Sequence, residues 1–290
     1  MNVSGNDFGF KDKFLNTVFH PSDFSKDSEI AFAHALKIAL SADSKLELFH
    51  VTAELRDSNL NDFPGIRQTL ERWNVLPEGI TKRHLADLGL HIKKKIVSNS
   101  DTVRSVLHQL KKNAADLIVL ATHQRKGISQ WLHKPIAEPV SRQSAKMTLF
   151  VPHGAQGFVS ISNGRVNLKQ ILIPIAHIPD PQPAVDTASK LAGILELEKA
   201  TFILLYVGSK SDVPKVNIYE KKNWTWKTVA RQGNIIDQIL YMENEHAPDL
   251  IVMATQGHEG FMDDLRGSTT ERILRNSRCP LLAIPDNQKH

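Results

Sequence analysis

The stretch Leu250–Arg275, LIVMATQGHEGFMDDLRGSTTERILR, decides the fold. It begins with an apolar run that is typical of a buried strand and ends with the apolar spacing of a helix. Between them stand Gly257 and, after a nine-residue spacer, Gly267-Ser268. Backbone N–H groups at a helix N-terminus favour negative charge, and glycine lets that backbone approach a phosphate closely. The stretch therefore indicates an anion-binding loop in an α/β sheet.

A purely structural reading of the same residues stays open. Ser268 and Glu271 have the spacing of a capping box, in which the serine closes the helix start and the glutamate reaches back to it. A glycine loop followed by a capped helix needs no ligand.

The chain contains the pattern twice, in the same order of strands and helices. The matched segments are Thr17–Phe19 and Ile171–Ile173, Leu46–Val51 and Thr201–Val207, Leu90–Val97 and Trp224–Val229, Ala115–Thr122 and Pro248–Thr255, and Met147–Pro152 and Pro280–Pro285. Asp101 and Asn234 are expected to cap equivalent helices. Strands that alternate with helices predict a parallel sheet with right-handed crossovers.

The repeat predicts two domains, residues 1–155 and residues 156–290. The boundary falls in the segment His153–Asn167, which is rich in Gly, Ser and Asn. The first copy carries an insertion, Ala53–Gly89, which looks helical around Gly65–Trp73 and has no assigned place in the fold.

Composition narrows the class of protein. The 290 residues are 41% hydrophobic and 23% charged, which is usual for a globular chain. Neither a transmembrane run nor the apolar core of a signal peptide is found, and the one cysteine, Cys279, favours a reducing, cytoplasmic setting. Cys279 precedes an apolar strand, so we expect a buried, inert thiol. A net charge of +5 without a long basic run makes a nucleic-acid partner unlikely.

Motifs for other chemistry are missing from the sequence. Among the 13 histidines, His20 with His50 and His84 with His91 are the pairs to consider for a metal, but no HExxH or CxxC spacing accompanies them. No Gly-x-Ser-x-Gly elbow and no lysine-bearing P-loop is present. We therefore predict no metal site and no named reaction.

Together the repeated segments resemble the universal stress protein family in its tandem two-domain form. The markers are Pro21-Ser22-Asp23 after the opening strand, a second strand that ends in Phe49-His50-Val51 where the family has Leu-His-Val, and an Asp-Leu-Ile-Val strand. A further marker is a loop that matches most of the family's Gly-x2-Gly-x9-Gly-Ser/Thr signature. The resemblance implies an α/β fold of two tandem, doubly wound, parallel five-stranded sheets of the adenine-nucleotide-binding, flavodoxin-like type. It also implies that the last strands, Met147–Val151 and Leu281–Ile284, face each other in an intrachain pseudo-dimer.

In the second half the resemblance keeps the phosphate end of the family's ATP-binding motif. Gly257 and Gly267-Ser268 match it, whereas its first glycine is Ala254 and its nucleoside-contacting aspartate is Ala176. Because ligands of such sheets sit outside the carboxyl ends of the strands, the predicted site consists of Pro174, Val207, Met253, Ala254, Gly257, Gly267, Ser268 and Thr269.

The first half shows the reverse pattern. Asp23 matches the family's aspartate, but Gln124 and Lys134-Pro135 replace the glycine loop, and proline offers no N–H donor. We therefore expect a degenerate site, with Asp23 acting as the cap of the helix Phe24–Leu40.

The resemblance implies a stress-response protein that acts as a non-catalytic sensor or switch and binds ATP or another adenine nucleotide through its second half. A nucleotide-free interaction protein that holds another small or apolar ligand is the alternative, and a slow ATPase is a weaker third option. Either reading allows an unknown protein partner and a homodimer, and neither requires a membrane.

Overall fold

The computed structural model describes residues 13–55, 59–77, 89–122, 136–255 and 269–286. In the first half the elements are β1 (Thr17–Pro21), α1 (Lys26–Ser41), β2 (Lys45–Thr52), α2 (Ile66–Arg72), β3 (His91–Ser98), α4 (Thr102–Lys112), β4 (Leu117–Thr122), α5 (Ala137–Ser144) and β5 (Met147–Pro152). In the second half they are β6 (Gln170–Ile175), α6 (Gln182–Ile194), β7 (Ala200–Val207), the 3-10 helix η2 (Lys210–Asp212), β8 (Trp224–Arg231), α7 (Ile235–His246), β9 (Leu250–Thr255), α8 (Thr269–Asn276) and β10 (Leu281–Pro285).

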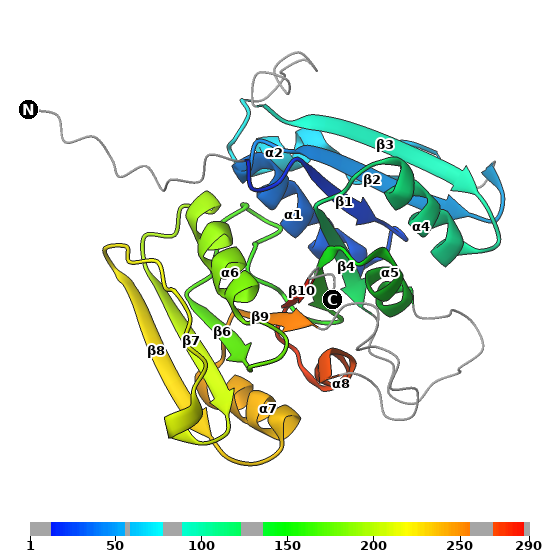
Figure 1. Cartoon of the computed structure of the whole chain (residues 1–290). Helices are drawn as coiled ribbons and strands as arrows, with labels where there is room; N and C mark the ends of the chain where they lie inside the picture. Colours follow the sequence, from blue (N-terminus) through cyan, green and yellow to red (C-terminus); the bar gives the residue numbers. More distant parts are fainter. Residues whose placement is uncertain (1–12, 56–58, 78–88, 123–135, 256–268, 287–290) are drawn as a thin grey trace, which may run out of the picture.

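The ten strands form one sheet in the order β3-β2-β1-β4-β5-β10-β9-β6-β7-β8 (Figure 1). Within each half all strand pairs are parallel, and the chain moves outward from the central strand first to one side and then to the other. This confirms the predicted doubly wound α/β class.

The two halves meet at their last strands. β5 and β10 pair antiparallel, with Leu282 opposite Leu149 and Ala283 opposite Thr148. The predicted pairing is confirmed, and it joins the two five-stranded sheets edge to edge. Each last strand would otherwise expose an apolar edge.

Asp116 and Asp249 occupy equivalent positions in the two halves and make equivalent hydrogen bonds. Asp116 Oδ2 accepts hydrogen bonds from the N–H groups of Asn16 and Thr17 at 2.7 and 3.0 Å. Asp249 Oδ2 accepts from Lys169 and Gln170 at 2.7 and 2.9 Å. Each carboxylate therefore satisfies backbone donors at the amino end of the central strand of its half.

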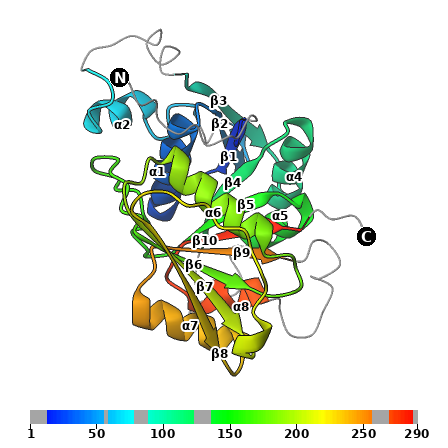
Figure 2. The same cartoon turned by 60° about the vertical axis from the view of Figure 1, so that its left-hand side comes forward.

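Helices cover both faces of the sheet. Apolar residues of α1 and α6 form one buried cluster with the strands, and these two helices lie next to each other in both Figure 1 and Figure 2. Residues of α4, α5, α7 and α8 form the second cluster on the opposite face. Burial on both faces explains why the inner strands are continuous apolar runs instead of alternating ones.

The segment that joins β5 to β6 is packed into the core. Phe158 is 0% exposed, and Val159 forms an antiparallel bridge with Val166. His34 of α1 accepts hydrogen bonds through Nε2 from the N–H groups of Phe158 and Val159, at 2.9 and 3.2 Å. The Gly-, Ser- and Asn-rich segment at the predicted domain boundary is therefore packed against the core.

Part of the insertion in the first half also packs against the core. The predicted helix is α2, and Leu70 and Trp73 at its end are buried. Trp73 donates its indole N–H to the carbonyl oxygen of Ile161 in the β5–β6 connection, at 2.9 Å. The insertion and the connection therefore support each other.

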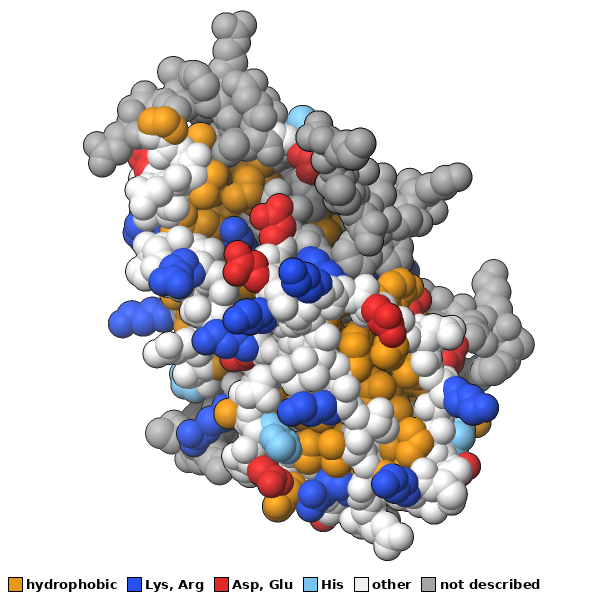
Figure 3. All heavy atoms as spheres, turned by 90° about the vertical axis from the view of Figure 1, so that its left-hand side faces the viewer, with side chains coloured by type: hydrophobic (Ala, Val, Ile, Leu, Met, Phe, Trp, Pro, Cys, Tyr) orange, Lys and Arg blue, Asp and Glu red, His pale blue; other side chains and the backbone are white. Residues whose placement is uncertain are grey.

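On the face shown in Figure 3, basic and acidic side chains are interspersed, with apolar side chains between them. Within the described residues, no helix combines the length and the hydropathy that a membrane crossing requires.

Candidate functional site

The carboxyl edge of the second half brings together four of the predicted site residues. Pro174 is the penultimate residue of β6, Val207 ends β7, and Met253 and Ala254 precede the last residue of β9. The pairing of Ile175 with Tyr206 sets the ends of β6 and β7 level with each other. These residues line one edge of the sheet, as the resemblance implies.

The helix α8 begins at that same edge. Thr269 is its first residue, and the buried Thr270 donates its hydroxyl to the sulfur of Met253 at 3.9 Å, which ties the helix start to β9. The remaining predicted residues, Gly257, Gly267 and Ser268, lie outside the described residues. The first N–H groups of α8 have no partner within a regular helix, so they suit an anion.

A polar cluster that sequence reasoning missed lies beside Ala176. Asp212 of η2 accepts a hydrogen bond through Oδ2 from the Tyr206 hydroxyl at 2.8 Å, and His177 Nε2 lies 3.3 Å from the same oxygen. His177 Nε2 also donates to the backbone carbonyl of Asp212 at 2.9 Å. The hydrogen bond from Tyr206 and the charge of His177 lower the pKa of Asp212, which keeps this carboxyl ionised.

At the equivalent edge of the first half, aromatic side chains pack together. Phe24, with φ of 60°, stacks on the His50 ring at 4.1 Å between centroids, and Phe63 stands edge-on to Phe24 at 5.1 Å. His50 Nδ1 donates to the carbonyl of Ser22 at 2.7 Å. Gln124, Lys134 and Pro135 lie outside the described residues.

The expected role of Asp23 is wrong. The cap of α1 is Ser25, whose hydroxyl accepts a hydrogen bond from the Ser28 N–H at 3.2 Å. Asp23 Oδ1 accepts instead from the Ser25 N–H at 3.0 Å, so it closes a turn one step earlier in the chain. The helix starts later because Phe24 takes a left-handed conformation that a helix cannot contain.

Of the four histidines considered for a metal, His20 and His50 have structural partners, and His84 lies outside the described residues. His20 is fully buried, and its Nδ1 donates to the carbonyl of Val119 at 2.9 Å while its Nε2 lies 3.4 Å from the Ser28 hydroxyl. Burial lowers the pKa of His20 to about 4, so the ring is neutral. In the described part of the chain, no group of three or more His, Cys, Asp or Glu side chains is placed to hold a metal.

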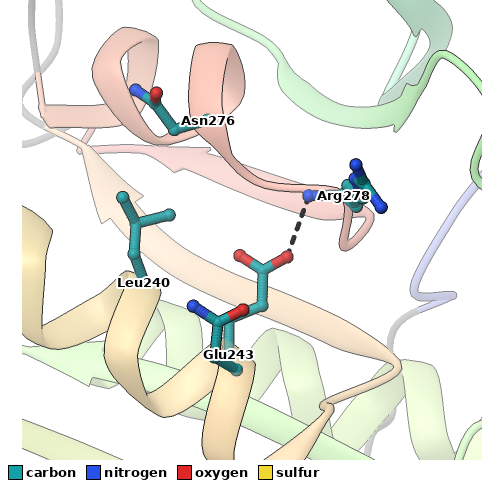
Figure 4. A pocket seen from close by; sticks show the side chains of 5 residues that line it. Leu240, Glu243, Asn276 and Arg278 are labelled. Carbon is teal, nitrogen blue, oxygen red and sulfur yellow. Dashed lines mark hydrogen bonds between the residues drawn. The ribbon is translucent and has the colours of Figure 1, made fainter.

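A pocket of about 420 Å³ lies at the opposite, amino edge of the sheet, between α7 and the turn that follows α8. Its lining residues are Leu240, Glu243, Asn244, Asn276 and Arg278. In Figure 4 the Glu243 carboxylate points to that turn, where Oε1 accepts from the N–H groups of Arg278 and Cys279 at 2.8 and 3.1 Å. Glu243 thus anchors the start of β10, and the pocket contains none of the predicted site residues.

We expect Cys279 to be unreactive in the folded protein. Burial, with the negative charges of Glu243 and Asp249 nearby, raises the pKa of its thiol well above the usual value, and the thiolate is the reactive form. Ellman's reagent should release almost no colour from the native chain and one equivalent from the chain in denaturant. Complete reaction of the native protein at the rate of a free thiol would contradict this expectation.

The fold of the chain agrees with its similarity to a known protein family. Residues 16–152 and 220–285 match the model of the universal stress protein family. The chain belongs to this family. A universal stress protein of Synechocystis is 26% identical over 144 residues, which make up 43% of this chain and 90% of that protein.

Two solved structures align with nearly the whole molecule. A universal stress protein from Archaeoglobus fulgidus aligns over 93% of this chain and 98% of its own, with a TM-score of 0.59 and 16% identity. A functionally unknown protein from Pseudomonas aeruginosa aligns over 93% and 92%, with a TM-score of 0.61 and 12% identity. At these identities the likeness concerns the fold, which this universal stress protein shares in both halves.

Proposed function

We propose that this universal stress protein is a non-catalytic stress-response module that binds ATP, or another adenine nucleotide, through its second half. The observation that carries the proposal is the sequence Gly257-x9-Gly267-Ser268 directly before α8, whose first residue, Thr269, lies at the carboxyl edge of the sheet. Glycine-bearing loops that lead into a helix start bind phosphate with backbone N–H groups.

The described residues of the second half suit such a ligand in two respects. The strand ends are apolar where a base would pack, with Val207 half-buried and Pro174 and Met253 buried. The start of α8 favours the phosphates. Ala176 supplies no carboxylate for the ribose. Binding then depends mainly on the phosphates, and occupancy would bias the order of the loop and hence the contacts with a protein partner.

The first half is proposed to leave its edge without nucleotide. Phe24, His50 and Phe63 pack against one another there, and Lys134-Pro135 stands where the motif supplies a donor and a hydroxyl. The proposal is compatible with a reducing, cytoplasmic setting and with a homodimer, but it does not depend on either.

The second candidate is a nucleotide-free interaction protein. Ala176 and Ala254 favour it, because both replace residues of the ATP-binding motif. Mass spectrometry of small molecules that co-purify with the native protein separates the candidates, since an adenine nucleotide supports the first and an apolar molecule the second.

Calorimetric titration with ATP tests the proposal, and we expect one site per chain. Gly267→Val should abolish binding, because a branched side chain keeps the backbone away from the phosphates. Gly193→Val is the matched control, since a Cβ at this position of α6 meets no atom within 4 Å. If Gly267→Val leaves the affinity for ATP unchanged, the loop serves only as a capped helix start. Two equivalent sites per chain would contradict the proposed difference between the halves.

A further inference from the structure

The second half carries a carboxylate, Asp212, that belongs to none of the motifs described above. It follows β7, the strand next to β6, whose end lacks the carboxylate at Ala176. Ala176 follows β6 directly, and its neighbour His177 contacts Asp212. Tyr206, the other partner of Asp212, precedes Val207 at the end of β7. The carboxylate of Asp212 is thus fixed to the residues that flank Ala176 and Val207.

We propose that Asp212, held by Tyr206 and His177, takes the part of the carboxylate missing at Ala176 and binds the ribose hydroxyls of the nucleotide. This inference rests on the nucleotide-binding function proposed above and names the group that recognises the sugar.

The hydrogen bonds fix which atoms remain for a ligand. Asp212 Oδ2 accepts from Tyr206, and His177 Nε2 faces two oxygens of Asp212, so Nε2 carries the hydrogen. Within the described part of the chain, Asp212 Oδ1 takes part in no hydrogen bond with another residue. A carboxylate oxygen is an acceptor, so Oδ1 can receive a hydrogen bond from a ligand.

The Asp212 carboxylate is placed to accept hydrogen bonds from the hydroxyls of a vicinal diol. The Asp212 side chain is 65% exposed, so a ligand can reach it without displacing a core residue. A hydroxyl that donates to a carboxylate makes a charge-assisted hydrogen bond, which is stronger than a neutral one. The ribose of a nucleotide presents two adjacent hydroxyls, whereas a phosphate or a bare base presents none.

A rival explanation is that Asp212 only secures the segment that follows β7. Asp212 N–H donates to Ser209 at 2.9 Å, and the carboxylate ties the same segment to Tyr206. A purely structural role would weaken the binding of every ligand alike. A role in ribose binding would weaken only ligands that have the hydroxyls.

The test compares ATP, 2′,3′-dideoxy-ATP and inorganic triphosphate by calorimetry on the full chain. The parent should bind ATP about 10- to 100-fold more tightly than dideoxy-ATP, the range expected for hydrogen bonds to a charged group. Asp212→Asn should lower ATP affinity to the dideoxy-ATP level and leave triphosphate binding unchanged. Asp180→Asn is the matched control, because this carboxylate lies near the same edge but accepts from the Gln182 N–H at 3.0 Å.

A second variant keeps the test independent of local folding. Adding Ala176→Asp to Asp212→Asn should restore the preference for ATP over dideoxy-ATP, since the carboxylate returns to the place that the motif gives it. Equal losses of ATP and dideoxy-ATP affinity in Asp212→Asn would overturn the ribose assignment while the proposed function stands. If the parent binds neither nucleotide nor triphosphate, both proposals are overturned.

Discussion

Replacing Phe158 with alanine should lower the free energy of unfolding by about 3–5 kcal/mol, the usual cost of deleting a buried phenylalanine ring. Phe158 is 0% exposed although it lies in the connection between the two halves. Its ring meets the His34 ring edge-on at 4.5 Å between centroids. Removing the ring leaves a cavity next to α1. Because hydrogen bonds to His34 hold the backbone of Phe158 and Val159, the surrounding chain can fill this cavity only in part.

Urea unfolding at neutral pH measures this effect through the shift of the midpoint at constant slope. Arg165→Ala, an exposed side chain of the same connection, is the matched control and should change stability by less than about 0.5 kcal/mol. If Phe158→Ala and Arg165→Ala both have such small effects, the connection is a loose linker and not part of the core.

The same connection shows where sequence reasoning ends. The strands could be predicted because each inner strand is buried on both faces, so that Leu117–Thr122 and Leu250–Thr255 read as continuous apolar runs. The connection carries few such residues among Gly, Ser and Asn, and its burial depends on His34, which lies more than a hundred residues away. A contact between residues so far apart in the sequence cannot be recognised from a local sequence pattern.

Of the helix caps predicted from the sequence, one is confirmed and one is wrong. Asp101 was correctly expected to cap α4, and its carboxylate accepts from the Arg104 N–H at 3.0 Å. Asp23 has an equally suitable side chain, but Ser25 caps α1 because the chain turns through the left-handed Phe24. Two cap-forming residues so close together compete, and only the backbone conformation between them decides.

The candidate site was accessible from the sequence only in part. The edge that holds Pro174, Val207 and Ala254 follows from the order of the strands, because carboxyl ends of parallel strands share one edge. The cluster of His177, Tyr206 and Asp212 does not. The carboxylate comes from the segment after β7, and its partners come from β7 and from the loop after β6. The only hint in the sequence is a polar run, Ser209–Asp212, which follows an apolar strand after Gly208.

Two buried histidines should make the protein less stable in acid. His20 and His34 are each 0% exposed, and burial lowers the pKa of each ring to about 4 from the usual value of 6.5. In the unfolded chain both rings take up a proton as the pH falls through about 6.5, whereas in the folded chain they stay neutral until about pH 4. Between these values the unfolded state binds more protons, so stability rises with pH.

The size of the effect follows from the two pKa values. Each histidine contributes stability that is fully present above about pH 6.5 and falls by up to about 1.4 kcal/mol per pH unit below it. By pH 4.5 the loss should reach roughly 2–3 kcal/mol per histidine. Urea unfolding between pH 7.5 and pH 4.5 measures it, on the ~5–15 kcal/mol scale of a whole domain.

A variant at His34 isolates one of the two contributions. In His34→Gln the amide oxygen can accept from the N–H groups of Phe158 and Val159 in place of the imidazole nitrogen, but it does not titrate. The loss of stability on acidification should then shrink by one histidine's share, roughly 2–3 kcal/mol at pH 4.5. His108→Gln, at an exposed position of α4, controls for the removal of an imidazole from the surface. A pH profile of His34→Gln that is as steep as that of the parent would show that His34 binds its proton equally in the folded and unfolded chains, and would remove it as a cause of acid sensitivity.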